Sequence, residues 1–236
     1  MPDYQHTDGV PFLVLDLETA PLPEAADFID VPLYPDMPPL DKRLTDPAKQ
    51  ESDRVAKMAK HAALIVEWQQ AQTDALNACA LNCDLGQITA VGYDCGDGVV
   101  VHTWPMTEEA MLADIACMVG PATTLCGFNL RFDLAFLMRR ALYLGVRFPA
   151  IGLGKYRATF CDLQDVLTFE GYLATKGRSL AFYKRRFKLD VPDDPTGGGE
   201  AMPALFAAGD WAAIRQHCEL DVQTTMALAK RLGVAR

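Results

Sequence analysis

Several features of membrane and secreted proteins are missing from this sequence. No run of 18 or more apolar residues occurs, so no segment is long enough to cross a bilayer as a helix. The chain begins without an apolar signal segment, and its seven cysteines are an odd number. Both observations favour a reduced, cytoplasmic setting. No CxxC pair is present, so the cysteines do not form a zinc-binding pattern.

Positive charge is scarce as well. The 22 Lys and Arg residues face 31 Asp and Glu residues, which gives a net charge of −9 and argues weakly against a passive nucleic-acid coat. Carboxylates that hold divalent ions, however, carry no net charge once those ions are bound. The positive residues also cluster, since six of them lie between positions 176 and 188: Lys176, Arg178, Lys184, Arg185, Arg186 and Lys188.

The pattern of apolar residues predicts one α/β domain over residues 1–236. Apolar runs typical of strands occupy 12–19, 87–93, 99–104, 123–128 and 157–161, with Gly96-Asp97-Gly98 as a hairpin turn. Helical patterns cover 108–119, 130–144, 163–170, 179–188 and 211–232. Three strands in a meander, followed by alternating helices and strands, predict a mixed five-stranded sheet flanked by helices.

An insertion separates the first two predicted strands. Residues 21–39 are rich in proline and predict an irregular loop that leaves the first strand and forms one wall of a site. Residues 46–82 lack glycine and predict one long helix or two short ones. Packing over the sheet is the simpler role for this helical insertion, and contact with a substrate or a partner is the alternative.

The first strand ends in two carboxylates. Asp16 and Glu18 share a face of the strand because side chains alternate along it, whereas Leu17 points to the opposite layer. Two like charges this close repel each other, and a hard divalent cation such as magnesium is the usual remedy. A solvated strand end is the other interpretation of an isolated pair of this kind.

Three more polar residues accompany this pair. Asp133 lies in the first turn of the helix at 130–144, where the helix dipole stabilises a negative charge. His217 and Asp221 are four residues apart on the last helix and therefore share a face, while Glu219 points elsewhere.

Three segments resemble the motifs of one enzyme family: DLET at 16–19, NLRFD at 129–133 and HCELD at 217–221. They are similar to the DEDD (DnaQ-like) 3′-to-5′ exonucleases of the ribonuclease H-like superfamily. The likeness is to the stand-alone bacterial and phage group related to the proofreading domain of family-B DNA polymerases, and it spans residues 11–232. The resemblance implies a ribonuclease H-like fold and two Mg²⁺ or Mn²⁺ ions held by Asp16, Glu18, Asp133 and Asp221.

The histidine departs from the family pattern. The tyrosine subclass has a Tyr three intervening residues before the last Asp, and the histidine subclass has four intervening residues. His217 stands at the spacing of the tyrosine subclass. The resemblance implies that it is the general base, a role that suits imidazole at neutral pH. A His that only packs beside the metal site is the alternative.

Several residues are candidates for substrate binding. By resemblance, Leu17, Thr19, Asn129 and Phe132 border the acids and position the last nucleotide. Arg178, Lys184 and Arg185 belong to a basic helix whose interleaved aromatic residues suit phosphate contacts and base stacking on a single strand. Aromatic residues packed inward, with the charges in solvent, are the alternative arrangement.

Together these features predict a metal-dependent 3′-to-5′ exonuclease that acts on single-stranded ends, with DNA favoured over RNA as its partner, and releases nucleoside 5′-monophosphates. A ribonuclease that trims short RNAs is the runner-up within the enzyme class. A catalytically silent nucleic-acid-binding or polymerase-accessory module is the competitor from another class.

Overall fold

The computed structural model describes residues 12–41, 43, 45–120, 123–153, 160–169 and 178–235. The strands are β1 (Phe12–Pro21), β2 (Gly86–Asp94), β3 (Val99–Thr103), β4 (Thr124–Gly127) and β5 (Phe160–Asp162). The α-helices are α1 (Pro47–Cys79), α2 (Glu108–Met118), α3 (Leu130–Leu144), α4 (Leu163–Leu167), α5 (Leu180–Phe187), α6 (Met202–Ala208) and α7 (Trp211–Arg231), and η1 (Ala25–Phe28) and η2 (Gly199–Ala201) are 3-10 helices. Predictions for residues 1–10, 157–159, 170 and Lys176 lie outside the described residues.

The five strands form one mixed sheet in the order β3-β2-β1-β4-β5. β1, β2 and β3 pair antiparallel, whereas β4 is parallel to β1 and β5 is parallel to β4. The hairpin between β2 and β3 turns at Gly96 and Gly98, which both have positive φ angles, and the Asp94 side chain accepts a hydrogen bond from each of their N–H groups. The predicted α/β class and mixed five-stranded sheet are therefore confirmed.

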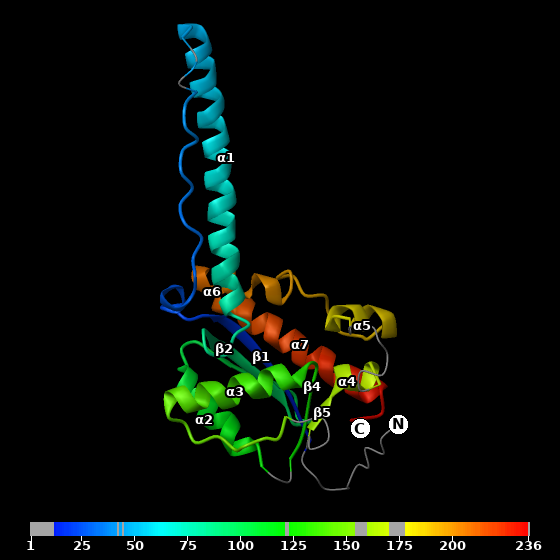
Figure 1. Ribbon diagram of the computed structural model, residues 1–236. Coiled ribbons are helices and arrows are strands. Elements are labelled where there is room, and N and C mark those ends of the chain that lie inside the picture. The colour runs from blue at the N-terminus through cyan, green and yellow to red at the C-terminus, as the bar shows by residue number, and fades with distance from the viewer. Residues whose placement is uncertain are drawn as a thin grey trace.

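Helices cover both faces of this sheet (Figure 1). Leu13, Leu15 and Leu17 of β1 enter the core formed with α2 and α3, while Val14 enters the core formed with α7. β1 is thus buried on both sides, as its apolar run predicts. The acidic residues near its carboxyl end break this pattern.

Helix α7 lies unusually close to the sheet at Gly92 of β2. A Cβ atom added at Gly92 would stand 2.7 Å from Cys218 Sγ and 2.7 Å from Val222 Cγ2, which is less than any ordinary van der Waals contact. The missing side chain at position 92 therefore sets the depth at which α7 sits on the sheet.

The predicted helical insertion is a single helix that projects from the sheet (Figure 1). α1 has 33 residues, a length of about 50 Å at about 1.5 Å per residue, and Cys79 near its end is its one buried residue within the described chain. Val55 is 55% exposed and Val66 is 65% exposed. The expectation that this helix packs over the sheet is wrong, because the apolar spacing that predicted a helix does not specify what that helix packs against.

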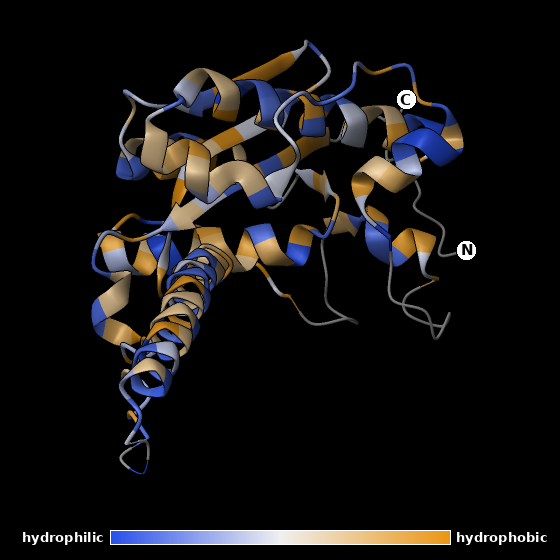
Figure 2. Ribbon diagram, turned by 90° about the horizontal axis from the view of Figure 1, so that it is seen from above, coloured by the Kyte–Doolittle hydropathy of each residue, from blue (hydrophilic) through white to orange (hydrophobic). Residues whose placement is uncertain are grey.

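The proline-rich segment runs beside α1 instead of bordering a site (Figure 1). The Trp68 indole donates a hydrogen bond to the Pro32 carbonyl at 2.7 Å, and the His61 ring contacts the Pro35 carbonyl at 2.9 Å. Tyr34 packs edge-on against Trp68. The prediction that this segment forms a wall of the site is therefore wrong. Figure 2 shows hydrophilic and hydrophobic residues mixed along α1, and no helix in the described part of the chain is long and apolar enough to span a bilayer.

Candidate metal and substrate site

The middle of β1 presents Asp16 and Glu18 toward α7. In the sheet register Asp16 lies opposite Gly92 and Glu18 opposite Ala90, two residues small enough to leave room for the helix. Glu18 is 5% exposed and Asp16 keeps a partly accessible surface. The pairing register shifts between Glu18 and Thr19, and such bulges commonly redirect side chains beside active sites. The two acids share a face, as the alternation of side chains predicts.

Asp133 reaches the same place from the first turn of α3. It is 4% exposed, and its Oδ1 accepts the Leu17 backbone N–H at 3.1 Å. Asn129 precedes the helix with a left-handed φ of 62°, and the Asp162 carboxylate accepts the Asn129 N–H at 3.0 Å. This hydrogen bond from the end of β5 fixes the turn that positions Asp133 beside β1.

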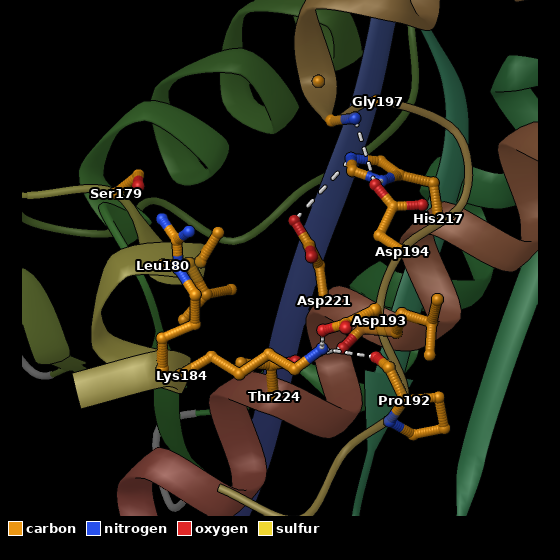
Figure 3. Close-up of a pocket in the computed structure, with 15 residues that line it drawn as sticks. Ser179, Leu180, Lys184, Pro192, Asp193, Asp194, Gly197, His217, Asp221 and Thr224 are labelled. Carbon is orange, nitrogen blue, oxygen red and sulfur yellow. Dashed lines mark hydrogen bonds and ion pairs between the residues drawn. The ribbon is translucent and has the colours of Figure 1, made fainter. Parts of the chain in front are cut away.

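Helix α7 contributes His217 and Asp221, which are one turn apart. His217 Nε2 lies 3.7 Å from Asp221 Oδ2 and 3.6 Å from Glu18 Oε1, and the His217–Asp221 contact is drawn in Figure 3. Three segments that are far apart in the sequence therefore converge on one cluster of acids with a histidine in contact with it.

The acids destabilise one another in their charged forms. Burial raises the pKa of Asp16 and of Glu18 well above their ordinary values, and repulsion by the neighbouring carboxylates, including Asp221 and Asp133, raises both further. Burial also raises the pKa of Asp133 and of Asp221. A divalent cation would remove both costs, because it replaces lost hydration and neutralises the repulsion.

The donor set fits a hard or borderline divalent ion. Asp16 and Glu18 lie within 4.8 Å of the Cys218 thiol, and Glu18 lies within 4.8 Å of the ligand atoms of His217 and Asp221. Burial and the surrounding carboxylates raise the pKa of Cys218 well above its ordinary value, so it remains a thiol, whereas metals bind the thiolate. The available ligands are therefore carboxylate oxygens and one imidazole nitrogen, which suit magnesium, manganese or a similar ion.

Asp194 belongs to the site although the sequence did not indicate it. Its Oδ2 lies 2.9 Å from His217 Nδ1 and accepts the Gly198 N–H at 3.0 Å, while its Oδ1 accepts the Thr196 N–H at 2.9 Å. The segment 193–200 is thus held by one carboxylate. An Asp followed by Thr and several glycines is a recognisable turn signal, but its contact with a histidine 23 residues away leaves no local trace in the sequence.

A cleft of about 490 Å³ opens beside Asp221 and His217, between α5, the segment 192–199 and α7 (Figure 3). Two of the predicted substrate-binding residues, Lys184 and Arg185, line it. The Lys184 ammonium also donates a hydrogen bond to Asp193 Oδ1 at 3.0 Å. The cleft is therefore lined by positive groups from α5 and by Asp221 from α7.

The other predicted substrate-binding residues do not line this cleft. Leu17 belongs to the core next to α2 and α3, and Thr19 is 7% exposed. Asn129 is exposed in the turn before α3, and Phe132 packs against another aromatic ring of that helix. The Arg178 guanidinium lies over an aromatic ring of α5.

The aromatic residues of the basic helix point mostly inward. Tyr183 packs against Phe128 at 5.9 Å and against Phe187 at 6.3 Å between ring centroids, and both α5 rings contact the core next to α7. Phe182 is 38% exposed. The inward arrangement of aromatic residues therefore describes Tyr183 and Phe187, and the basic side chains face the cleft or the solvent.

Comparison with known proteins gives a relative but no activity. No family model matches the chain. A protein of the archaeon Methanocaldococcus jannaschii, called Uncharacterized protein MJ0365, is 30% identical over 164 residues, which represent 62% of this chain and 85% of that protein. The chain belongs to the family of this archaeal protein. The name of that protein assigns no reaction.

Proposed function

We propose that the protein is a metal-dependent 3′-to-5′ exonuclease that shortens single-stranded nucleic acid, DNA in preference to RNA, and releases nucleoside 5′-monophosphates. The observation that carries the proposal is the convergence of Asp16 and Glu18 from β1, Asp133 from α3 and Asp221 from α7. The sheet order, with one antiparallel meander and two parallel strands, also fits the ribonuclease H-like fold that the motifs imply.

The acids would hold two magnesium or manganese ions. Two such ions supply activation of water and stabilisation of the charge that develops on the phosphate and the departing oxygen. Asp16 is near Glu18, Asp133 and Asp221, so its carboxylate would hold the ions together with theirs. The burial of the other acids excludes water that would otherwise weaken their hold on the cations.

The cleft offers a path for the strand that leads to the acids. Lys184 and Arg185 would neutralise backbone phosphates, which is binding without sequence preference. Gly197, Gly198 and Gly199 border the same cleft.

Side-by-side digestion tests this proposal. Single-stranded DNA, duplex DNA and RNA with 5′ labels would be incubated with Mg²⁺, Mn²⁺ or a chelator, and we expect metal-dependent shortening of single-stranded DNA from its 3′ end with release of mononucleotides. Asp16→Ala and Asp221→Ala should abolish hydrolysis. Glu219→Ala is the matched control, because Glu219 is an exposed acid on the same helix.

Each competing function gives a different result. Faster digestion of RNA than of DNA would favour the exoribonuclease. Binding of single strands without divalent ions and without release of mononucleotides would favour the silent accessory module. Hydrolysis at the wild-type rate by Asp16→Ala would contradict the proposed role of the acid cluster.

A further inference from the structure

The imidazole of His217 is surrounded by three carboxylates. Its side chain is 4% exposed, and the nearest acids are Glu18, Asp194 and Asp221. The two ring nitrogens face different partners, since Nδ1 faces the segment 193–200 and Nε2 faces the acid cluster (Figure 3). Buried polar atoms normally have a bonding partner, so each nitrogen of this buried ring should have one.

The Nδ1 side is held by Asp194. The same carboxylate accepts the N–H groups of Thr196 and Gly198 at 2.9 and 3.0 Å. It accepts from Nδ1 in the same way across the 2.9 Å contact between Nδ1 and Asp194 Oδ2. Nε2 is then the ring nitrogen left to bind a cation.

Nε2 faces two acids that are too far away to form a hydrogen bond with it. Glu18 Oε1 and Asp221 Oδ2 lie 3.6 and 3.7 Å away, which is beyond hydrogen-bond distance. With metal–ligand bonds of about 2.1 Å, two neighbouring ligands roughly 90–120° apart are about 3.0–3.6 Å from each other. Nε2 is therefore about as far from each oxygen as two ligands of one ion are from each other, and all three ligand atoms lie within 4.8 Å of one another.

We propose that His217 Nε2 is a metal ligand that completes, with Glu18 and Asp221, a site of mixed nitrogen and oxygen donors which selects manganese or a similar first-row transition ion over magnesium. Asp194 is the positioning residue, because histidine ligands of metals usually donate their second ring N–H to a carboxylate that fixes the ring. Magnesium prefers oxygen ligands, whereas imidazole suits transition ions. The inference deepens the proposed function, since it uses two of the same acids and gives His217 a role other than general base.

Electron paramagnetic resonance on the full chain loaded with Mn²⁺ tests the inference without any nuclease assay. The chain has four histidines, and we expect coupling of Mn²⁺ to a histidine nitrogen that changes when the histidines are labelled with ¹⁵N. His217→Ala should abolish the coupling. His102→Ala should retain it, and is a matched control because His102 also contacts an acid, Asp114, at 2.7 Å. The isotope arm needs no variant, so the test survives if His217→Ala fails to fold.

Metal affinity provides the second measurement. His217→Ala and Asp194→Ala should each weaken Mn²⁺ binding by about 10- to 100-fold and change Mg²⁺ binding little, while Asp194→Asn, which retains an acceptor oxygen, should recover part of the loss. Bound Mn²⁺ without nitrogen coupling, or equal losses for both ions, would overturn the inference and leave the nuclease proposal intact. Nitrogen coupling in a protein that releases no mononucleotides would support the inference and refute the nuclease.

Discussion

Replacement of Gly92 by Ala tests whether the distance between α7 and the sheet controls the geometry of the site. The new Cβ would stand 2.7 Å from Cys218 Sγ and 2.7 Å from Val222 Cγ2. Both atoms belong to the helix that carries His217 and Asp221, since Cys218 is next to His217 and Val222 is next to Asp221. The substitution therefore perturbs the site without touching a proposed ligand.

The size of the displacement follows from these distances. Carbon and sulfur atoms in contact are normally about 3.5–4.0 Å apart, so α7 must move away from β2 by about 1 Å at this position. Overpacking of this kind costs about 1–3 kcal/mol of the free energy of unfolding. A misplacement of about 1 Å at a catalytic site costs about 100-fold in rate, so we expect activity to fall much more than stability.

Three measurements follow Gly92→Ala: the urea midpoint of unfolding, the affinity for Mn²⁺ and the rate of hydrolysis of single-stranded DNA. The triple variant Gly92→Ala, Cys218→Ala, Val222→Ala removes both obstructing atoms and should recover part of the lost Mn²⁺ affinity. Gly120→Ala is the control, because its Cβ would lie 3.7 Å from the nearest atom. Stability, metal affinity and rate all equal to wild type in Gly92→Ala would refute the reasoning.

Two further predictions concern stability. Burial raises the pKa of Glu18 and Asp133 above their ordinary values of 4.5 and 3.8. The metal-free folded protein therefore retains protons that the unfolded chain releases. The stability that these two groups contribute falls as the pH rises above about 4. Urea unfolding with a chelator at pH 5 and pH 8 should show a smaller decline for Glu18→Gln than for wild type, and an equal decline would contradict this assignment. Arg140 donates two hydrogen bonds of 2.8 Å to Glu108, whose Oε1 also accepts the Ile88 N–H. In the same assay Arg140→Ala should lower the free energy of unfolding by about 3–5 kcal/mol. A loss below about 1 kcal/mol, as for an exposed pair, would show that this ion pair does not stabilise the fold.

Much of the architecture could be predicted from the sequence because it depends on the local pattern of apolar and polar residues. An apolar run that ends in Asp16 and Glu18 predicts a buried strand with two acids on one face, and alternation of side chains alone guarantees that they share it. Helix spacing likewise places His217 and Asp221 on one face of α7. The order of strands and helices then predicts the class of fold, since a meander followed by βα units leaves few arrangements.

The tertiary structure decided everything that depends on partners distant in sequence. The apolar spacing of α1 predicts a helix, but whether that helix covers the sheet or projects from it depends on the proline-rich segment beside it. In the same way the sequence identified His217, but only the folded chain places Asp194 on one ring nitrogen and two acids on the other. Local pattern sets conformation through short-range sterics and hydrogen bonds, whereas the choice between a base and a ligand depends on charges that come together only when the chain folds.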